Sequence, residues 1–588
     1  MRLINTNIRE TLEVKEFWGS EIPRYAILSH TWEEEEVSFQ QFTQLPREEL
    51  SKMKGFAKIE KTCQLARTSG IEWAWVDTCC IDKSSSAELT EAINSMFHWY
   101  QESAVCYAYL SDLKSEKREE KRDDREKRED GSRERRGQRE DGEKPEKRGE
   151  KPHAEKPEQN LSLAVGDKKS DDGKALFKRE RSADRRPVNE GLSFSQRVDK
   201  YAHCRWFTRG WTLQELIAPR RLGFYDCNWR FQGEKDALSG ELAEITHINK
   251  RILDKANLLS TVSVAQRMSW ASNRQTTRAE DMAYCLLGIF GVQIPMLYGE
   301  GSKAFIRLQE EIIKESNDLS LFAWRAHATS QKHWGVLALS PNDFTDCADI
   351  ELWDEAMYND EFVVTSKGLR VTPVAGGGLR LGRDATYVLN LQCHRRGSDK
   401  DLGIFLRQHG CDMYTRVWPD DFSETLGYHP EVAETKGRMF YISKMVSPVL
   451  SVVLGSSHRS SINLSRAIAA LKNAEFLIKK DGSVEPAGHW DTQRDLFLTQ
   501  GMRDFVCRLS FSQGSDRRGS PLTMECTLRD GKVSVNFTIE TGPGRFASGR
   551  VLQKRDSRGN VVDWLRASVF QEAVSGQPMY FVTVDVLS

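Results

Sequence analysis

Residues 204–219 read Cys-Arg-Trp-Phe-Thr-Arg-Gly-Trp-Thr-Leu-Gln-Glu-Leu-Ile-Ala-Pro, and they decide how the fold is interpreted. The pattern predicts one helix that ends at the final proline, because proline cannot continue a helical hydrogen-bond ladder. In such a helix Phe207, Trp211 and Glu215 are four residues apart and share one face. A carboxylate on an aromatic face has two explanations. Either Glu215 accepts a backbone N–H in a capping box that begins at Thr212, or it faces a cleft and does chemistry beside a stacking surface.

Strands and helices alternate on both sides of this stretch. Short apolar runs predict strands, and apolar residues at helical spacing predict helices. The predicted strands are residues 24–30, 71–77, 104–110 and 222–226, and the predicted helices before the stretch are about 49–69 and 85–100. Such alternation is typical of a mostly parallel sheet that is covered on both faces. We therefore expect an α/β domain over residues 1–230.

Ligands of parallel sheets gather beyond the carboxyl ends of the strands, and polar residues collect there in this chain. Those residues are Ser29 and His30, the segment from Asp77 to Asp82, Ser111 and Asp112, and Asp226. Ser29 and His30 cannot form a dyad with each other, because successive strand side chains point to opposite faces.

Several of these residues have more than one interpretation. His30 can meet Cys79 or Cys80 at the neighbouring strand end in a Cys–His arrangement, although cysteines are also common in cores. Asp77 and Asp82 can bind ribose hydroxyls, pair with arginines, or cap their loops. Arg209 is either a surface charge or a phosphate clamp.

Three further regions follow from composition and pattern. Residues 114–190 alternate Lys, Arg, Glu and Asp with almost no apolar residue, which predicts a disordered charged insertion, because such a segment cannot offset its chain entropy. Residues 231–330 are expected to form a helical extension. From 331 to 588, alternating apolar segments bounded by Gly, Asp and Ser predict a β-rich, sandwich-like domain, which we interpret as a scaffold or partner surface.

The overall composition limits the classes of partner. With 85 basic and 86 acidic residues the net charge is -1, which argues against nucleic acid as a partner. The 12 cysteines include no CxxC pair, which argues against zinc sites and a disulfide scaffold and for a reducing compartment. No signal-peptide core and no run of about 20 apolar residues is present, so we expect a cytoplasmic protein without a membrane span.

Three sequence blocks resemble the fungal heterokaryon incompatibility (HET) domain. They are Tyr-Ala-Ile-Leu-Ser-His-Thr-Trp at 25–32, Trp-Val-Asp-Thr-Cys-Cys-Ile-Asp-Lys at 75–83, and Arg205 to Pro219. With the segments around 263–271 and 284–305, the resemblance to vegetative incompatibility proteins covers roughly the first 325 residues apart from the insertion. The family usually has a glycine where Glu33 stands here. The resemblance implies a part in self/non-self recognition that ends in cell death, with a second copy or an incompatibility protein as partner.

The HET domain is in turn similar to TIR domains, which have a flavodoxin-like parallel sheet. Many TIR domains cleave NAD with a glutamate in a Trp-Cys-x-x-Glu-Leu pattern, and residues 211–216 match that pattern with Thr in place of Cys. The resemblance implies that Glu215 is the catalytic carboxylate, which would stabilise or trap an oxocarbenium-like state. NAD would then be a substrate, and no cofactor or metal is expected.

The residues expected to bind substrate lie around Glu215. They are Ser29, His30, Trp32, Asp77, Asp82, Arg209 and Trp211, with Trp32 or Trp211 stacking on a ring of the substrate. The alternative is a non-enzymatic module that acts by oligomerising. The two hypotheses differ in whether Glu215 lines a cleft with His30 and Asp77 or folds back on the amide of Thr212.

Overall fold

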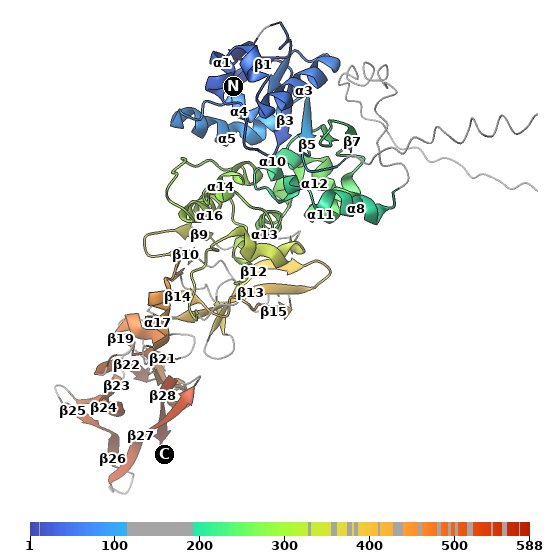
Figure 1. Ribbon diagram of the computed structural model, residues 1–588. Helices are drawn as coiled ribbons and strands as arrows, with labels where there is room; N and C mark the ends of the chain where they lie inside the picture. Colours follow the sequence, from blue (N-terminus) through green and yellow to red (C-terminus); the bar gives the residue numbers. More distant parts are fainter. Residues whose placement is uncertain are drawn as a thin grey trace, which may run out of the picture.

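The computed structural model describes residues 1–10, 12–114, 192–326 and, with short gaps, 331–587. The gaps in the last range are 354–360, 373–378, 382–385, 410–411, 427–438, 457–460, 479–483, 492–494, 500–501, 503, 514–520, 543–544, 556–560 and 575–576. The charged insertion expected at 114–190 therefore lies, except for Lys114, outside the described residues. The elements follow one another along an elongated molecule, from the α/β part at the N-terminus to the strands near the C-terminus (Figure 1).

The N-terminal part is built on a seven-stranded sheet with the strand order β2-β1-β4-β3-β5-β6-β7. The strands are β1 (Arg2–Asn5), β2 (Val14–Glu16), β3 (Tyr25–His30), β4 (Trp73–Trp75), β5 (Val105–Tyr109), β6 (Leu222–Tyr225) and β7 (Phe231–Glu234). The four central strands β4, β3, β5 and β6 are parallel, as predicted. The antiparallel edge strands β1, β2 and β7 were not predicted. All six residues of β3 are buried, which explains its continuous apolar run.

Helices pack on this sheet, and two of them match the sequence pattern closely. The helices are α1 (Phe39–Gln44), α2 (Arg47–Leu50), α3 (Lys54–Thr68), α4 (Asp77–Cys80), α5 (Ser86–Glu102), α8 (Phe194–Ala202), α9 (Arg205–Thr208) and α10 (Thr212–Ile217). The α3 helix buries Phe56, Ile59 and Cys63, and α5 buries Ile93 and Met96. The strand expected at 71–77 is shorter, and Asp77 begins α4 instead of ending a strand.

The single helix expected over 204–219 is wrong, because the chain breaks between α9 and α10. Arg209 is extended, with φ −82° and ψ 137°. The segment around it pairs with Gln275: the amide of Gly210 donates to the Gln275 carbonyl at 2.8 Å, and the Gln275 amide donates to the Thr208 carbonyl at 2.7 Å. Hydrogen bonds to a distant segment thus replace the helical ladder. Phe207, Trp211 and Glu215 therefore do not share one helical face.

The extension expected over 231–330 is helical in segments from Ser239 to Phe322, whereas its first residues form strand β7. The elements are α11 (Ser239–Thr246), α12 (Lys250–Asp254), η4 (Ala256–Thr261), α13 (Val264–Ser269), α14 (Asp281–Tyr284), α15 (Leu287–Phe290), α16 (Lys303–Glu315) and η5 (Leu319–Phe322). Among the described residues, no helix has the length and hydrophobicity needed to cross a bilayer.

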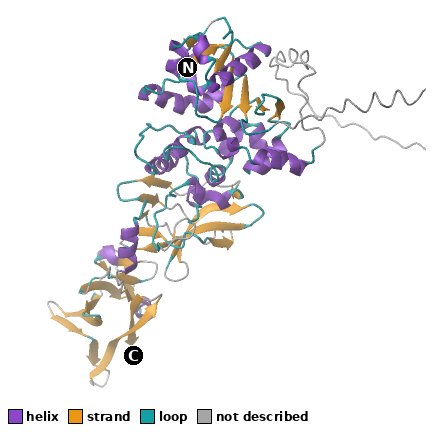
Figure 2. Ribbon diagram, in the orientation of Figure 1, coloured by secondary structure: helices purple, strands orange, loops and turns teal. Residues whose placement is uncertain are grey.

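The C-terminal part is β-rich, as expected, and the strands dominate the lower half of the molecule in Figure 2. A nine-stranded sheet holds β8 (Ile350–Leu352), β9 (Glu361–Val364), β10 (Leu369–Thr372), β11 (Leu379–Leu381), β12 (Tyr387–Arg395), β13 (Lys400–Gln408), β14 (Met413–Arg416), β15 (Ser423–Leu426) and β16 (Phe440–Ile442). Two six-stranded sheets hold β17 (Ser461–Asn463), β18 (Phe476–Ile478), β19 (Val484–Glu485), β20 (Trp490–Asp491), β21 (Leu496–Leu498), β22 (Phe505–Gln513), β23 (Leu522–Arg529), β24 (Lys532–Gly542), β25 (Arg545–Gly549), β26 (Val551–Arg555), β27 (Val561–Val574) and β28 (Gln577–Val586). Helical segments between the strands are η6 (Pro341–Cys347), α17 (Pro448–Ser456), α18 (Ser465–Asn473) and η8 (Ala487–His489).

The described chain has two large hydrophobic clusters and a small one formed by Val388, Phe405 and Val417. The first large cluster contains buried residues between Met1 and Ile442, and the α/β part, the helical extension and the nine-stranded sheet share it. The second runs from Ile462 to Val584 and is shared by the two six-stranded sheets. The domain boundaries near residues 230 and 330 stay a prediction.

Candidate functional site

The carboxyl end of β3 places Ser29 and His30 on opposite faces of the strand, as the alternation predicted. The Ser29 hydroxyl donates a hydrogen bond to the Glu215 carboxylate. The same hydroxyl oxygen accepts a hydrogen bond from the Trp206 indole N–H at 2.8 Å. Ser29 and Trp206 are fully buried, and Glu215 is 5% exposed. Ser29 therefore joins the end of the central strand to the α9–α10 segment.

Glu215 does not cap its own helix. The residue before α10 is Trp211, and it makes no side-chain capping bond. The Thr212 hydroxyl donates to the carbonyl oxygens of Trp206 and Arg209, across the break between the two helices. The capping-box explanation of Glu215 is therefore wrong. Its carboxylate points to the end of β3 instead.

Burial controls the protonation of Glu215. It raises the pKa of this carboxyl to about 8, and the nearby negative charge of Asp77 acts in the same direction. The hydrogen bond from Ser29 and the positive charges of Arg209 and Arg274 oppose this increase only in part. Among the described residues, no basic side chain lies within ion-pair distance of Glu215. Near neutral pH the protonated form of this carboxyl is therefore favoured.

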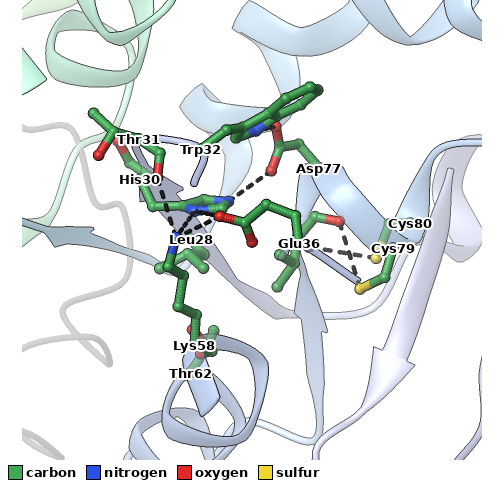
Figure 3. A network of polar contacts seen from close by, with 12 residues as sticks. Leu28, His30, Thr31, Trp32, Glu36, Lys58, Thr62, Asp77, Cys79 and Cys80 are labelled. Carbon is green, nitrogen blue, oxygen red and sulfur yellow. Dashed lines mark hydrogen bonds and ion pairs between the residues drawn. The ribbon is translucent and has the colours of Figure 1, made fainter. Parts of the chain in front are cut away.

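His30 belongs to a second polar network, which Figure 3 shows from close by. Its Nε2 lies 2.9 Å from one oxygen of Asp77, and the other oxygen of Asp77 accepts the indole N–H of Trp32 at 2.7 Å. The opposite ring nitrogen, Nδ1, lies 3.4 Å from the ammonium of Lys58. Lys58 also donates to the Thr31 carbonyl at 3.1 Å and pairs with Glu36. The network thus fixes the chain just after β3.

Asp77 is held in its ionised form. Burial alone would raise its pKa, but the hydrogen bond and charge of His30 outweigh burial, together with the charge of Lys83 and the Trp32 N–H. The net result is a pKa below the usual range. Because Asp77 acts electrostatically on Glu215, the two networks share one site. The site thus holds one ionised carboxylate and one largely protonated carboxyl group.

The Cys–His arrangement is not formed. The Cys79 thiol donates to the Val76 carbonyl at 3.8 Å, and the Cys80 sulfur accepts the Val76 amide at 3.3 Å. Burial raises the pKa of Cys79 well above its usual value. Both ring nitrogens of His30 face other partners, so neither thiol has a base beside it.

Of the other predicted residues, Trp32 lies at the site and Asp82 caps a turn. Trp32 is 40% exposed, with the Lys83 ammonium 3.5 Å and the Arg209 guanidinium 5.5 Å from its ring centroid. Asp82 lies in a turn, where it accepts from Gln40 at 2.6 Å and from the Ser84 amide at 2.9 Å, as a loop cap does.

The side chain of Trp211 faces Asp281 in the helical extension, where it lowers the pKa of that carboxyl. Of the residues expected at the site, the structure brings together Ser29, His30, Trp32, Asp77, Arg209 and Glu215.

Sequence reasoning missed four residues of these networks: Trp206, Glu36, Lys58 and Lys83. The sequence signal for Lys58 is weak, because this residue lies at the edge of the buried face of α3, where it is only 6% exposed. A lysine on a buried helix face needs a partner. Trp206 offered no comparable signal, because an aromatic residue in a helix is usually core.

A separate cavity of about 830 Å³ lies between the helical extension and the nine-stranded sheet. It is lined by Ala243, His247, Ile248, Asn249, Gln266, Arg325, Thr345, Asp346, Ala348, Asp349, Arg395 and Arg396. None of the predicted site residues contributes to it. In the part of the chain that the structure describes, no group of three His, Cys, Asp or Glu side chains is placed to hold a metal ion.

Comparison with known proteins identifies the part of the chain that carries the site. The family model described as "Heterokaryon incompatibility protein (HET)" matches residues 25–215, which begin at β3 and end at Glu215. A domain of unknown function (DUF8212) matches residues 303–338. Vegetative incompatibility protein HET-E-1 of Podospora anserina is 36% identical over 324 residues, which cover 54% of this chain but 18% of that relative.

No solved structure matches the chain. The blocks that suggested the family all lie within the matched region or directly beside it. Residues 25–215 therefore match the heterokaryon incompatibility (HET) family, and this matched region is called the HET domain below.

Proposed function

We propose that this chain acts in vegetative incompatibility, and that its HET domain hydrolyses NAD or a related nucleotide in the cytoplasm to bring about cell death. The family match and the named relative support the first part. One observation supports the proposed hydrolysis. Glu215 does not cap its helix, and Ser29 donates a hydrogen bond to it at the carboxyl end of the central strand. Ligands of parallel sheets bind at this edge.

The proposed reaction breaks the bond between the ribose C1′ and the nicotinamide nitrogen. The bonding electrons leave with nicotinamide, which departs as a neutral molecule and needs no strong general acid. The oxocarbenium-like sugar that remains is stabilised or trapped by the Glu215 carboxylate, as in glycoside hydrolysis. Water then adds to C1′ and loses a proton, which yields ADP-ribose. The carboxylate must be ionised, so the rate should rise with pH as Glu215 titrates near 8.

The burial of Glu215 sets a condition on this mechanism. With 5% of the residue exposed, a dinucleotide reaches the carboxylate only after the site opens. We propose that assembly, with a second copy or with an incompatibility partner, supplies this opening. Interactions that hold a site closed until a partner binds are a common basis of switching.

The same burial favours a second candidate, a non-enzymatic module whose toxicity comes from oligomerisation. In that case Ser29, Trp206 and Glu215 are a buried structural network, and no nucleotide is consumed. The two candidates differ in the fate of NAD when Glu215 is changed to Gln, which is close in size and can still accept the Ser29 hydrogen bond.

The test expresses the full chain in cells and follows NAD content and survival together. Glu241→Gln is the matched control, because Glu241 is 4% exposed and lies outside the site, paired with Arg197 at 2.6 Å. We expect NAD loss and death with the wild type and with Glu241→Gln, and neither with Glu215→Gln. NAD loss at the wild-type rate with Glu215→Gln would refute the catalytic role. Death without NAD loss in all three would establish the non-enzymatic module.

A further inference from the structure

Trp32 holds two cations beside the site. Its indole N–H is anchored on Asp77 at 2.7 Å, so the ring is fixed although 40% of the residue is exposed. The ammonium of Lys83 lies 3.5 Å and the guanidinium of Arg209 lies 5.5 Å from the ring centroid. Cations are attracted to the face of an indole ring. The arrangement therefore brings two positive charges from separate segments to one place.

These cations lack the carboxylate partners that neighbouring cations have. Lys58 pairs with Glu36 and also lies 3.7 Å from Glu33. By contrast, neither Lys83 nor Arg209 has an ion-pair partner among the described residues.

The acids near Lys83 act on it from beyond ion-pair distance. They are Asp77 and Glu36, and both oxygens of Asp77 are hydrogen-bonded, one to His30 and the other to Trp32. Two like charges held close together repel each other, and an anion between them removes that repulsion.

We infer that Lys83 and Arg209, held by Trp32, form a clamp for the phosphate groups of a nucleotide. The planar guanidinium suits two oxygens of one phosphate, and the ammonium acts as a point charge on a second. The identification of this anion as the diphosphate of a dinucleotide rests on the proposed function. The charge of Arg209 also acts on Glu215, so the clamp and the carboxylate belong to one site. Trp32 then acts as a support for cations and not as a free stacking surface.

The clamp has a consequence for specificity. A substrate with a diphosphate contacts both cations, whereas a nucleoside such as nicotinamide riboside has no phosphate for them to bind. We expect kcat/KM for NAD to fall about tenfold for each cation that is removed, mainly through KM. For nicotinamide riboside, the same substitutions should lower kcat/KM much less than they lower it for NAD.

The decisive experiment is calorimetric titration of the full chain with inorganic pyrophosphate and with ADP-ribose. The variants are Lys83→Gln, Arg209→Gln and the double variant. The controls are Lys367→Gln and Arg407→Gln, because these cations also lie over aromatic rings, at 4.2 Å from Tyr441 and 5.7 Å from Trp418, away from the site.

We expect each site variant to weaken both ligands about tenfold and the double variant to weaken them further, with both controls binding as the wild type does. Unchanged affinity in the double variant, or an equal loss in the controls, would overturn the clamp. A loss of pyrophosphate binding without a loss of ADP-ribose binding would overturn the assignment to a dinucleotide. If binding depends on both cations but NAD is never consumed, the clamp stands and the proposed hydrolysis fails.

Discussion

At the scale of single residues, Glu215 links the stability of the protein to its proposed chemistry. Burial raises the pKa of its carboxyl from 4.5 to about 8. The folded state therefore binds this proton more tightly than the unfolded state does. Stability falls as the pH rises from about 4.5 to about 8, because in that range folding keeps a proton that the unfolded chain releases.

This linkage predicts the effect of Glu215→Gln on thermal unfolding. The amide cannot ionise, so the variant should unfold at a higher temperature than the wild type above pH 8. The difference should grow from about pH 4.5 to about pH 8, level off above that, and reach on the order of a few kcal/mol. Scanning calorimetry across this pH range measures it, with Glu241→Gln as the control. A difference that stays constant with pH would contradict the raised pKa.

Asp77 should behave in the opposite way. Its pKa is lowered in the folded state, so the stability it contributes is present above its usual value of 3.8 and is lost as the pH falls below it. Asp77→Ala leaves His30 and Trp32 without their shared acceptor and should cost about 1–3 kcal/mol at pH 7.

Thermal unfolding of Asp77→Ala measures this cost, with Asp82→Ala as the comparison, because Asp82 accepts from Gln40 and from the amide of its own turn and not from His30 or Trp32. Equal losses for the two variants would mean that the network around His30 contributes nothing beyond a loop cap.

At the scale of elements, the parallel strands were predictable and the break between α9 and α10 was not. The strands β3, β5 and β6 appear as local apolar runs, and their alternation with helices fixes a parallel sheet. The opposite directions of Ser29 and His30 follow from strand geometry alone. These features depend on residues that are close in sequence, so the sequence pattern records them.

The break depends on contacts across more than sixty residues. Gly210 approaches so closely to the loop at Gln275 that a Cβ there would lie 2.5 Å from Thr276 Cγ2 and 3.1 Å from Cys285 Sγ. Helical spacing cannot reveal such a contact, and for the same reason the Trp206 hydrogen bond to Ser29 was not foreseen. The sequence predicted the site residues at the strand ends. It did not predict the contacts by which distant segments position those residues.

Gly210→Ala should therefore disturb the site more than an ordinary glycine substitution does. The added methyl group must displace Thr276 or shift α10, with an expected cost of about 1–3 kcal/mol and a loss of nucleotide turnover. Gly240→Ala in helix α11 is the matched control: the added Cβ would make an ordinary 3.4 Å contact with Phe194 of α8, and the substitution should be neutral or slightly stabilising. Thermal unfolding and NAD turnover of both variants check this, and equal stability would contradict the close approach.

At the scale of the whole molecule, the HET domain does not have a core of its own. The first hydrophobic cluster continues through the helical extension into the nine-stranded sheet. Arg416 of β14 is fully buried, where its guanidinium lies 3.9 Å from the Trp324 ring centroid and donates to the Phe322 and Trp324 carbonyls. Lys444 pairs with Glu310 of α16 at 2.6 Å. The helical extension thus depends on strands that follow it in sequence.

Truncation should show this dependence directly. A chain cut after residue 325 loses the partners of Phe322 and Trp324 and exposes part of the first cluster, so it should aggregate or unfold at a lower temperature. A chain cut after residue 456 retains the whole of that cluster and should stay monodisperse. Size-exclusion chromatography and thermal unfolding of the two fragments provide the comparison. Equal behaviour would mean that the HET domain and the helical extension are stable without the nine-stranded sheet.

The most direct test of the catalytic role of Glu215 is the rate of nicotinamide release by the purified, assembled full chain, wild type against Glu215→Gln. We predict that the wild type releases nicotinamide from NAD, faster as the pH approaches 8, and that Glu215→Gln loses about 10² to 10⁴ of that rate while it remains folded. Release by the folded variant at the wild-type rate, or no release by the assembled wild type, would contradict it.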